Sequence, residues 1–201
     1  MDDVARALQQ VAEIREQMAK GEIYRGYRSV PVALSGVIGL LAAWLQPHLV
    51  GTREPVAFVL YWVGVAACAV AVGASEIVFN YVVHEQPSTR RRTRLVIGQF
   101  LPAVLAAAVI TASFVHLDRG LVPILPGLWA VCFGLGTFAS SPYLPKASAW
   151  VASFYCAAGT GLLWAADTST PGPWWVGGVF GVGQLLAALV LYTSLERERS
   201  L

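Results

Sequence analysis

Three polar residues stand four positions apart at the end of a long apolar run, and they are the best candidates for chemistry. They are Glu76, Asn80 and His84. Residues four apart share one face of a helix, so the three form a polar stripe. A carboxylate, an amide and an imidazole in line could bind an ion or a polar ligand, or relay protons, since histidine titrates near neutral pH. The alternative is an ordinary helix end at a membrane surface, where such groups meet lipid headgroups.

Arginines gather in the segments beside the apolar runs. The set comprises Arg25, Arg28, Arg90, Arg91, Arg92 and Arg94. Guanidinium groups at the edge of a membrane attract anionic lipid phosphates or an acidic partner. We therefore expect these arginines to form a docking surface for anionic lipid or for a cytoplasmic protein.

The first 28 residues are predicted to form a cytoplasmic amphipathic helix followed by an interfacial anchor. Val4, Leu8, Val11 and Met18 fall on the a and d positions of a heptad repeat, which favours pairing of two copies. Fewer than three heptads are too short to pair alone in water, so a homodimer would need help from the rest of the chain. The alternative is a helix that lies flat on the membrane.

Residues that could hold a metal ion or a cofactor are sparse. His48 and His116 are expected at the surface away from the arginines, and two histidines on different helices could hold haem or a metal ion. No HxxxH, HExxH or Cys/His cluster supports such a site, so no cofactor is predicted and haem stays as an alternative. The cysteines, Cys68, Cys132 and Cys156, lie inside apolar runs and are expected to pack as small residues.

Composition places these candidates in a membrane protein. The chain has 201 residues, of which 56% are hydrophobic and 13% are charged, whereas soluble domains carry about 25% charged residues. A chain this short could not hide so much apolar surface from water, so lipid is its expected solvent. The net charge of +2 is too small to indicate nucleic acid as a partner. The GxSxG, P-loop and dinucleotide motifs are absent, so an enzyme is not favoured.

Six apolar runs predict the fold class, an all-α integral membrane protein built as a six-transmembrane-helix bundle. The expected spans cover residues 30–50, 56–84, 95–115, 121–140, 147–166 and 174–194, within a membrane domain of residues 29–194 that a cytoplasmic tail of residues 195–201 follows. A run of ~20 apolar residues crosses the ~30 Å hydrocarbon core, and only a helix satisfies its own backbone there. Tryptophans near the start of every second span suggest three similar helical hairpins, although interfacial anchoring also accounts for them.

Small residues spaced by four predict where helices approach one another closely. The pairs are Ser35 with Gly39, Ala69 with Gly73, Gly136 with Ser140, Ala157 with Gly161, and Gly177 with Gly181. Polar residues also fall inside the expected spans, among them Gln99 and Thr111. Most of them should bond to helix carbonyls or neighbouring helices, and a few could line a pocket.

The basic residues predict the orientation of the spans. Of the 14 Lys and Arg residues, all but Arg53 and Arg119 fall on the side of the membrane that carries both termini. Cytoplasmic loops carry such an excess, so both termini are predicted to face the cytoplasm, with the protein in the plasma (inner) membrane.

These observations lead to three functional hypotheses. The first is a small polytopic inner-membrane protein that binds or translocates a small molecule or ion through the polar stripe, which would open to the cytoplasm. The second is a non-transporting interaction or regulatory protein that docks a cytoplasmic partner through its N-terminal helix and basic loop. The third is a haem-binding or metal-binding membrane protein.

Overall fold

The computed structural model describes residues 29–50, 54–83, 87–167 and 171–196, with side chains for all of these except 76–93 and 195–196. Within these ranges the chain is helical and contains no strand, which confirms the all-helical prediction. The α-helices are α2 (Ser29–Leu49), α3 (Pro55–Val83), α4 (Pro87–Leu117), α5 (Leu125–Ser140), α6 (Ser148–Ala165) and α7 (Pro173–Leu191). Two short 3₁₀ segments are η1 (Arg119–Ile124) and η2 (Ser141–Tyr143), and η3 (Tyr192–Glu196) is a π-helical turn.

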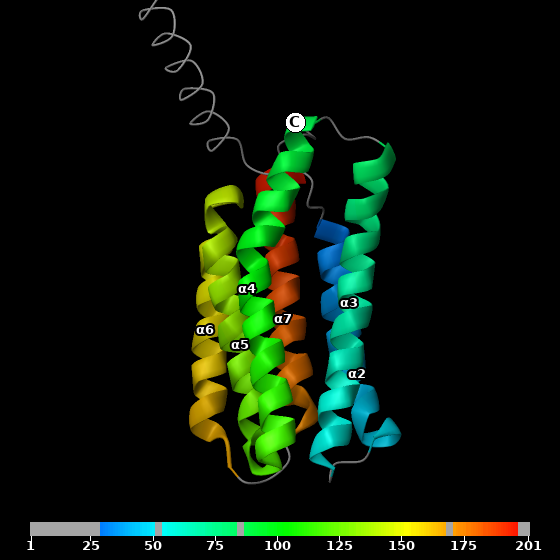
Figure 1. Ribbon diagram of the computed structural model, residues 1–201. Helices are drawn as coiled ribbons and strands as arrows, with labels where there is room; N and C mark the ends of the chain where they lie inside the picture. The colour runs from blue at the N-terminus through cyan, green and yellow to red at the C-terminus, as the bar shows by residue number, and fades with distance from the viewer. Residues whose placement is uncertain (1–28, 51–53, 84–86, 168–170, 197–201) are drawn as a thin grey trace, which may run out of the picture.

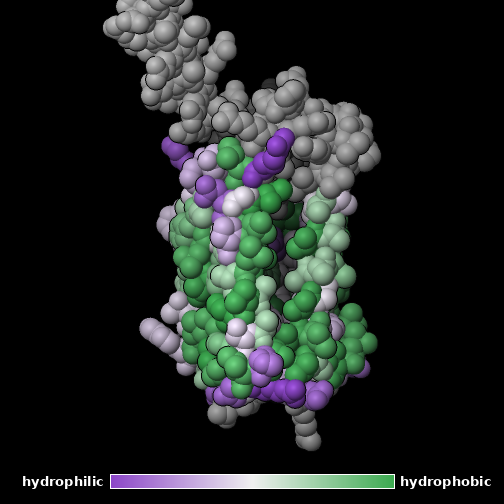
Figure 2. Space-filling model, in the orientation of Figure 1, coloured by the Kyte–Doolittle hydropathy of each residue, from purple (hydrophilic) through white to green (hydrophobic). Residues whose placement is uncertain are grey.

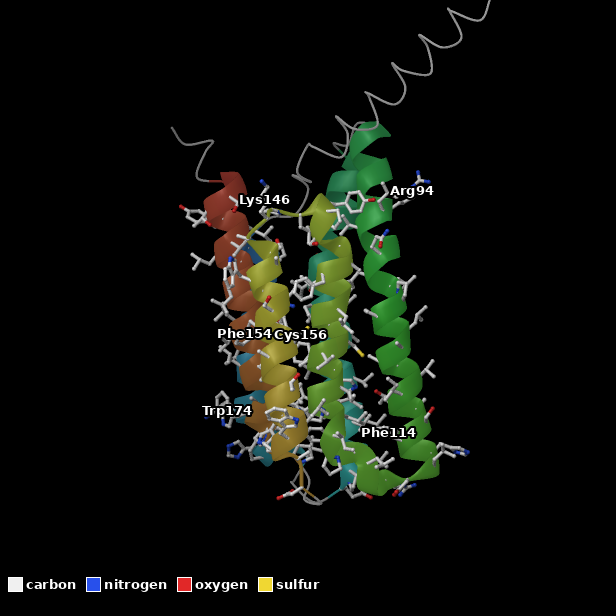
Figure 3. The ribbon with its side chains drawn as sticks, turned by 90° about the vertical axis from the view of Figure 1, so that its left-hand side faces the viewer. Arg94, Phe114, Lys146, Phe154, Cys156 and Trp174 are labelled. Carbon is white, nitrogen blue, oxygen red and sulfur yellow. The ribbon has the colours of Figure 1, made fainter. Side chains whose placement is uncertain are left out.

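The helices run up and down side by side as a bundle (Figure 1). At one end of the bundle α3 ends and α4 begins, and α5 passes through η2 toward α6. At the other end α4 leads through η1 into α5. We name the first end the basic end, because the exposed side chains of Arg94 and Lys146 lie there (Figure 3). The second is called the opposite end.

Five of these helical segments are long and apolar enough to cross a membrane. They are Ser29–Leu49, Pro55–Ser75, Arg94–Leu117, Arg119–Tyr143 and Pro173–Ser194. The remaining helix, α6, is 18 residues long and lies alongside them. An apolar belt separates the hydrophilic residues at the two ends of the bundle (Figure 2). These features together suggest a membrane protein.

Glycine contacts explain why α2 packs most extensively on α7. A Cβ atom added at Gly36 would lie 2.9 Å from the Gly181 carbonyl oxygen, and one added at Gly39 would lie 3.5 Å from the Gly181 nitrogen. Side chains are therefore missing where the two backbones meet, which lets van der Waals contact develop along both helices. The predicted pair Gly177 with Gly181 lies in this contact, opposite Gly36 and Gly39.

The contact between α5 and α6 is built in the same way. A Cβ atom added at Gly159 would lie 2.7 Å from the Gly127 carbonyl oxygen and 2.8 Å from the Val131 nitrogen. α4 then packs on α5, where a Cβ atom at Gly136 would lie 2.8 Å from the Phe100 ring. The close packing therefore forms where glycine removes a side chain from the interface.

The most extensive packing joins helices that belong to different hairpins of the suggested repeat. α2 packs on α7, and α5 packs on α6, whereas the suggested hairpins would pair α2 with α3, α4 with α5, and α6 with α7. Two other predicted small-residue pairs lack this close contact within the described part of the chain, because a Cβ atom at Gly73 or Gly161 would find no atom there within 4 Å. The pairs α2 with α3, α4 with α5, and α6 with α7 are in contact as well, and the repeat of three similar hairpins stays a prediction.

α3 is held to the bundle mainly at the opposite end. Phe58, Val59 and Trp62 are at most 5% exposed and belong to one apolar cluster with residues of α2, η1, α5 and α7. From Val63 to Ser75, by contrast, no residue of α3 is buried. The half of α3 toward the basic end is thus only loosely covered by the rest of the described chain.

Candidate functional site

The polar stripe lies at the basic end of α3. Glu76 and Asn80 occupy the last turns of this helix, while His84 lies outside the described residues. Helix geometry fixes the side of α3 on which these positions fall, since a residue advances by 100° around an axis with 3.6 residues per turn. The reference for that side is Trp62, which is 3% exposed and packs into the bundle.

Position 80 lies five full helical turns beyond Trp62, and therefore directly in line with it along α3. Position 76 is offset from that line by roughly 40°. Both positions consequently lie on the side of α3 that faces the bundle, rather than on the outward side. The stripe thus shares the interior side of its helix with the residues that anchor α3.

The same side of α3 is less closely covered between Trp62 and the basic end. Val65, Ala69 and Gly73 lie on this side and are half-buried, and among the described residues no atom lies within 4 Å of a Cβ atom added at Gly73. Contacts between α3 and α4 are sparse. The surface is hollowed between α4 and α3 in Figure 2. We call this hollow the crevice.

α4 supplies the second wall of the crevice. Ile110 of α4 packs against the apolar cluster that contains Trp62, so its side of α4 is turned toward that cluster. Gln99 lies three helical turns before Ile110, within roughly 20° of the same side, and is exposed. The exposed Ala106 lies between them. Gln99 therefore lies on the same side of α4 as Ile110.

Aromatic side chains close the crevice toward the opposite end. We call this group the aromatic floor: Phe58 and Trp62 from α3, Phe114 from α4, and Trp129 from α5. The Trp129 indole Nε1 donates to the Thr111 hydroxyl at 2.8 Å. Each ring is packed against neighbours from other helices, so the aromatic floor closes the crevice toward the opposite end.

Two further hydrogen bonds fasten α3 to α2 at the floor. The Tyr61 hydroxyl donates to the Ala42 carbonyl at 2.6 Å, and the Trp62 indole Nε1 donates to the Gln46 amide oxygen at 2.8 Å. Gln46 is fully buried. The floor therefore combines apolar packing with a polar connection in its interior.

Sequence reasoning did not single out Gln46, although a signal was present. Gly36, Gly39, Ala43 and Gln46 follow one another at spacings of three and four, and all four are buried. Gln46 thus continues the small-residue face of α2. A glutamine on such a face is expected to point at another helix, whereas its position just before Pro47 resembles a span end.

The predicted docking surface lies largely beyond the described side chains. Arg94 is exposed at the basic end (Figure 3), while Arg90, Arg91 and Arg92 are on α4, where only the backbone is described. Residues outside the described ranges are Arg25 and Arg28 of this surface, and Val4, Leu8, Val11 and Met18 of the expected dimer contact. Both the docking surface and the homodimer remain predictions.

The two histidines proposed as alternative metal ligands are exposed in the last turns of their helices. His48 is the last residue but one of α2, with its ring centroid 5.8 Å from that of Trp44, and His116 is the last residue but one of α4. Among the described residues, no group of three or more His, Cys, Asp or Glu side chains could hold a metal ion. The haem or metal alternative therefore gains no support and stays a prediction.

Comparisons of this chain with protein-family models, with curated proteins and with solved structures find no match. The function is therefore inferred from the geometry of the crevice alone.

Proposed function

We propose that this chain is a six-span membrane protein that binds a cation, or a small molecule carrying positive charge, in the crevice and passes it across the membrane. The observation that carries the proposal is the side on which the stripe lies. Positions 76 and 80 share the bundle-facing side of α3 with Trp62, at the level where α3 parts from its neighbours. A stripe serving only as a membrane-surface helix end would have no reason to face inward.

Exposed aromatic residues near both ends of the bundle support insertion into a membrane. On α6, Trp150 is 79% exposed and Trp164 is 87% exposed, and the 14 helical steps from one to the other span about 21 Å. Trp174 and Tyr192 are exposed near the two ends of α7 in the same way. Aromatic rings at two levels, with an apolar surface between them, are typical of the two membrane interfaces.

The orientation and the location follow from the charges. The exposed Arg94 and Lys146 at the basic end agree with the excess of basic residues on the side of the termini. By the positive-inside rule the basic end faces the cytoplasm, in the plasma (inner) membrane. The crevice would then open to the cytoplasm and the aromatic floor would close it from outside.

The chemistry of the crevice favours positive charge. Glu76 is the one carboxylate within the apolar sequence runs, and ionisable groups at membrane depth are costly enough that they usually serve a function. The amide groups of Asn80 and Gln99 add oxygen atoms that coordinate cations or accept hydrogen bonds. A small cation or an ammonium group is therefore the preferred ligand class.

Liposomes containing the purified protein test this proposal. The probes are protons, followed with entrapped pyranine, and then sodium, potassium and the fluorescent cation ethidium. We expect the native protein to move at least one probe, and Glu76→Gln to reduce that flux to the level of empty liposomes. Glu54→Gln is the matched control. Glu54 is an exposed carboxylate that directly precedes α3, at the opposite end of the bundle from Glu76.

Two results would contradict the proposal. One is equal flux of every probe through the native protein and Glu76→Gln. The other is an equal loss of flux in Glu76→Gln and Glu54→Gln, because that would point to a general effect of lost acidic charge rather than to the crevice.

A further inference from the structure

The amide nitrogen of Gln46 has no hydrogen-bond partner. Gln46 is fully buried, and its Nε2 is the one buried side-chain nitrogen or oxygen without a partner in the described part of the chain. The orientation of the amide is fixed by chemistry, since an indole N–H can only donate and must meet the amide oxygen. The unpartnered nitrogen is therefore a property of this arrangement rather than a matter of which way the amide is turned.

A buried donor without an acceptor weakens the arrangement that contains it. The arrangement here is the closed floor, in which the Trp62 indole occupies the Gln46 oxygen. If Trp62 moved away, both ends of the amide would become available to another molecule. The unpartnered nitrogen thus lowers the cost of opening the floor relative to a fully satisfied contact.

Trp62 is held by a second contact that is equally specific. A Cβ atom added at Gly177 of α7 would lie 2.8 Å from Cη2 of the Trp62 ring. The edge of the indole therefore rests where α7 has no side chain, while its nitrogen bonds to α2. Trp62 fills the junction of three helices and lies in line with position 80 at the basic end of α3.

We propose that Trp62 is the gate that closes the crevice toward the opposite end, and that the Gln46 amide oxygen is a ligand-binding group beneath it. In the closed arrangement the indole N–H caps that oxygen. When the indole leaves, the oxygen is free to coordinate a cation or to accept a hydrogen bond from an ammonium group. This inference rests on the proposed function, because it assigns the far end of the same path.

Labelling of a single cysteine from each side of the membrane tests the gate. The background carries Cys68→Ala, Cys132→Ala and Cys156→Ala, and the probe is Gly73→Cys, placed in the open space of the crevice. A membrane-impermeant, charged methanethiosulfonate is applied separately to right-side-out and inverted vesicles. Lys146→Cys and Arg119→Cys, both at exposed positions, report which end of the protein each vesicle preparation presents.

We expect Gly73→Cys to react only from the basic end while Trp62 is intact. Adding Trp62→Ala should open the floor and raise the reaction rate from the opposite end at least about tenfold, a change that needs only ~1.4 kcal/mol in the balance of closed and open forms. Tyr155→Ala is the matched control, because Tyr155 is also a fully buried aromatic donor, but it bonds to the Phe180 carbonyl of α7 and belongs to a different apolar cluster from Trp62. It should leave the rate from the opposite end unchanged.

The outcomes separate the gate from the proposed function. If Gly73→Cys does not react from the basic end, the crevice is not accessible to water, and this result contradicts the proposed function as well. Reaction from the basic end, with equal rates from the opposite end in Trp62→Ala and Tyr155→Ala, would overturn the gate alone. If Trp62→Ala does not yield a monodisperse protein, Gln46→Leu replaces it, and a rate from the opposite end that stays at the native value overturns the gate.

Discussion

Two glycines on one turn of α6 should respond in opposite ways to the same substitution. Gly159 is buried against α5, where a Cβ atom would lie 2.7 Å from the Gly127 carbonyl oxygen, and Gly161 has no neighbour within 4 Å. Each Gly→Ala change brings the same gain in helix propensity, up to about 1 kcal/mol. That gain cancels when the two variants are compared, so their difference isolates the clash at Gly159.

The clash at Gly159 is with backbone atoms of α5, which cannot rotate away. Forcing a methyl group into such a contact typically costs about 1–3 kcal/mol. For a chain of this size, a loss of 1 kcal/mol lowers the melting temperature by roughly 2–4 °C. We therefore expect Gly159→Ala to melt about 2–12 °C below Gly161→Ala, and Gly161→Ala to melt at or slightly above the native protein.

Thermal unfolding followed by tryptophan fluorescence in one detergent measures this difference directly. Size-exclusion chromatography of both variants checks that each remains monodisperse before heating. Equal melting temperatures for Gly159→Ala and Gly161→Ala would refute the reasoning that glycine packing joins α5 to α6.

Further predictions concern the hydrogen bonds at the floor, each measured by the same unfolding assay. Trp62→Phe leaves both ends of the Gln46 amide without a partner and should cost about 1–3 kcal/mol. The control Trp150→Phe, at a residue that is 79% exposed, should change stability by no more than about 0.5 kcal/mol. Thr111→Val keeps the shape of the side chain but removes the acceptor of the Trp129 indole N–H, and should cost about 1 kcal/mol. A melting temperature of Trp62→Phe equal to that of Trp150→Phe would contradict the first prediction, and an unchanged melting temperature of Thr111→Val would contradict the second.

The helices themselves could be predicted from the sequence because lipid allows few alternatives. An apolar run of the right length must satisfy its backbone internally, so length and hydropathy alone indicate a helix. Some ends of the described helices follow the apolar runs closely, as where the run expected at 30–50 becomes Ser29–Leu49, whereas α4 begins at Pro87, eight residues before the run expected at 95–115. Local composition determines this level of structure.

The partners of each helix could not be predicted in the same way. Gly73, Gly161 and Gly177 all belonged to predicted small-residue pairs, yet only Gly177 lies in close contact with another helix. A missing side chain permits close approach, but it does not specify which helix approaches. Pairing depends on how the whole set of faces fits together, and a single sequence does not report that fit.

The polar stripe could be predicted from the sequence in part, better than the pairing of the helices but less fully than the helices themselves. Its spacing predicted that Glu76 and Asn80 share one face of a helix, but the spacing cannot say whether that face points inward or outward. The direction became available only from the buried position of Trp62 on the same helix. The role of Gln46 needed still more, namely the hydrogen bond from α3 to α2.

The accessibility of nitroxide spin labels placed one at a time at positions 63–75 of α3 shows whether the bundle-facing side of this helix meets water. We expect the collision rates with two quenchers to vary along α3 with a period of about 3.6 residues, one rate being highest where the other is lowest. Collision with a water-soluble nickel complex should peak on the side of Ala69 and Gly73, and collision with oxygen, which dissolves in lipid, should peak on the side of Gly64 and Ala71. Equal exclusion of the nickel complex from Gly73 and Gly64 would contradict a crevice that opens to water.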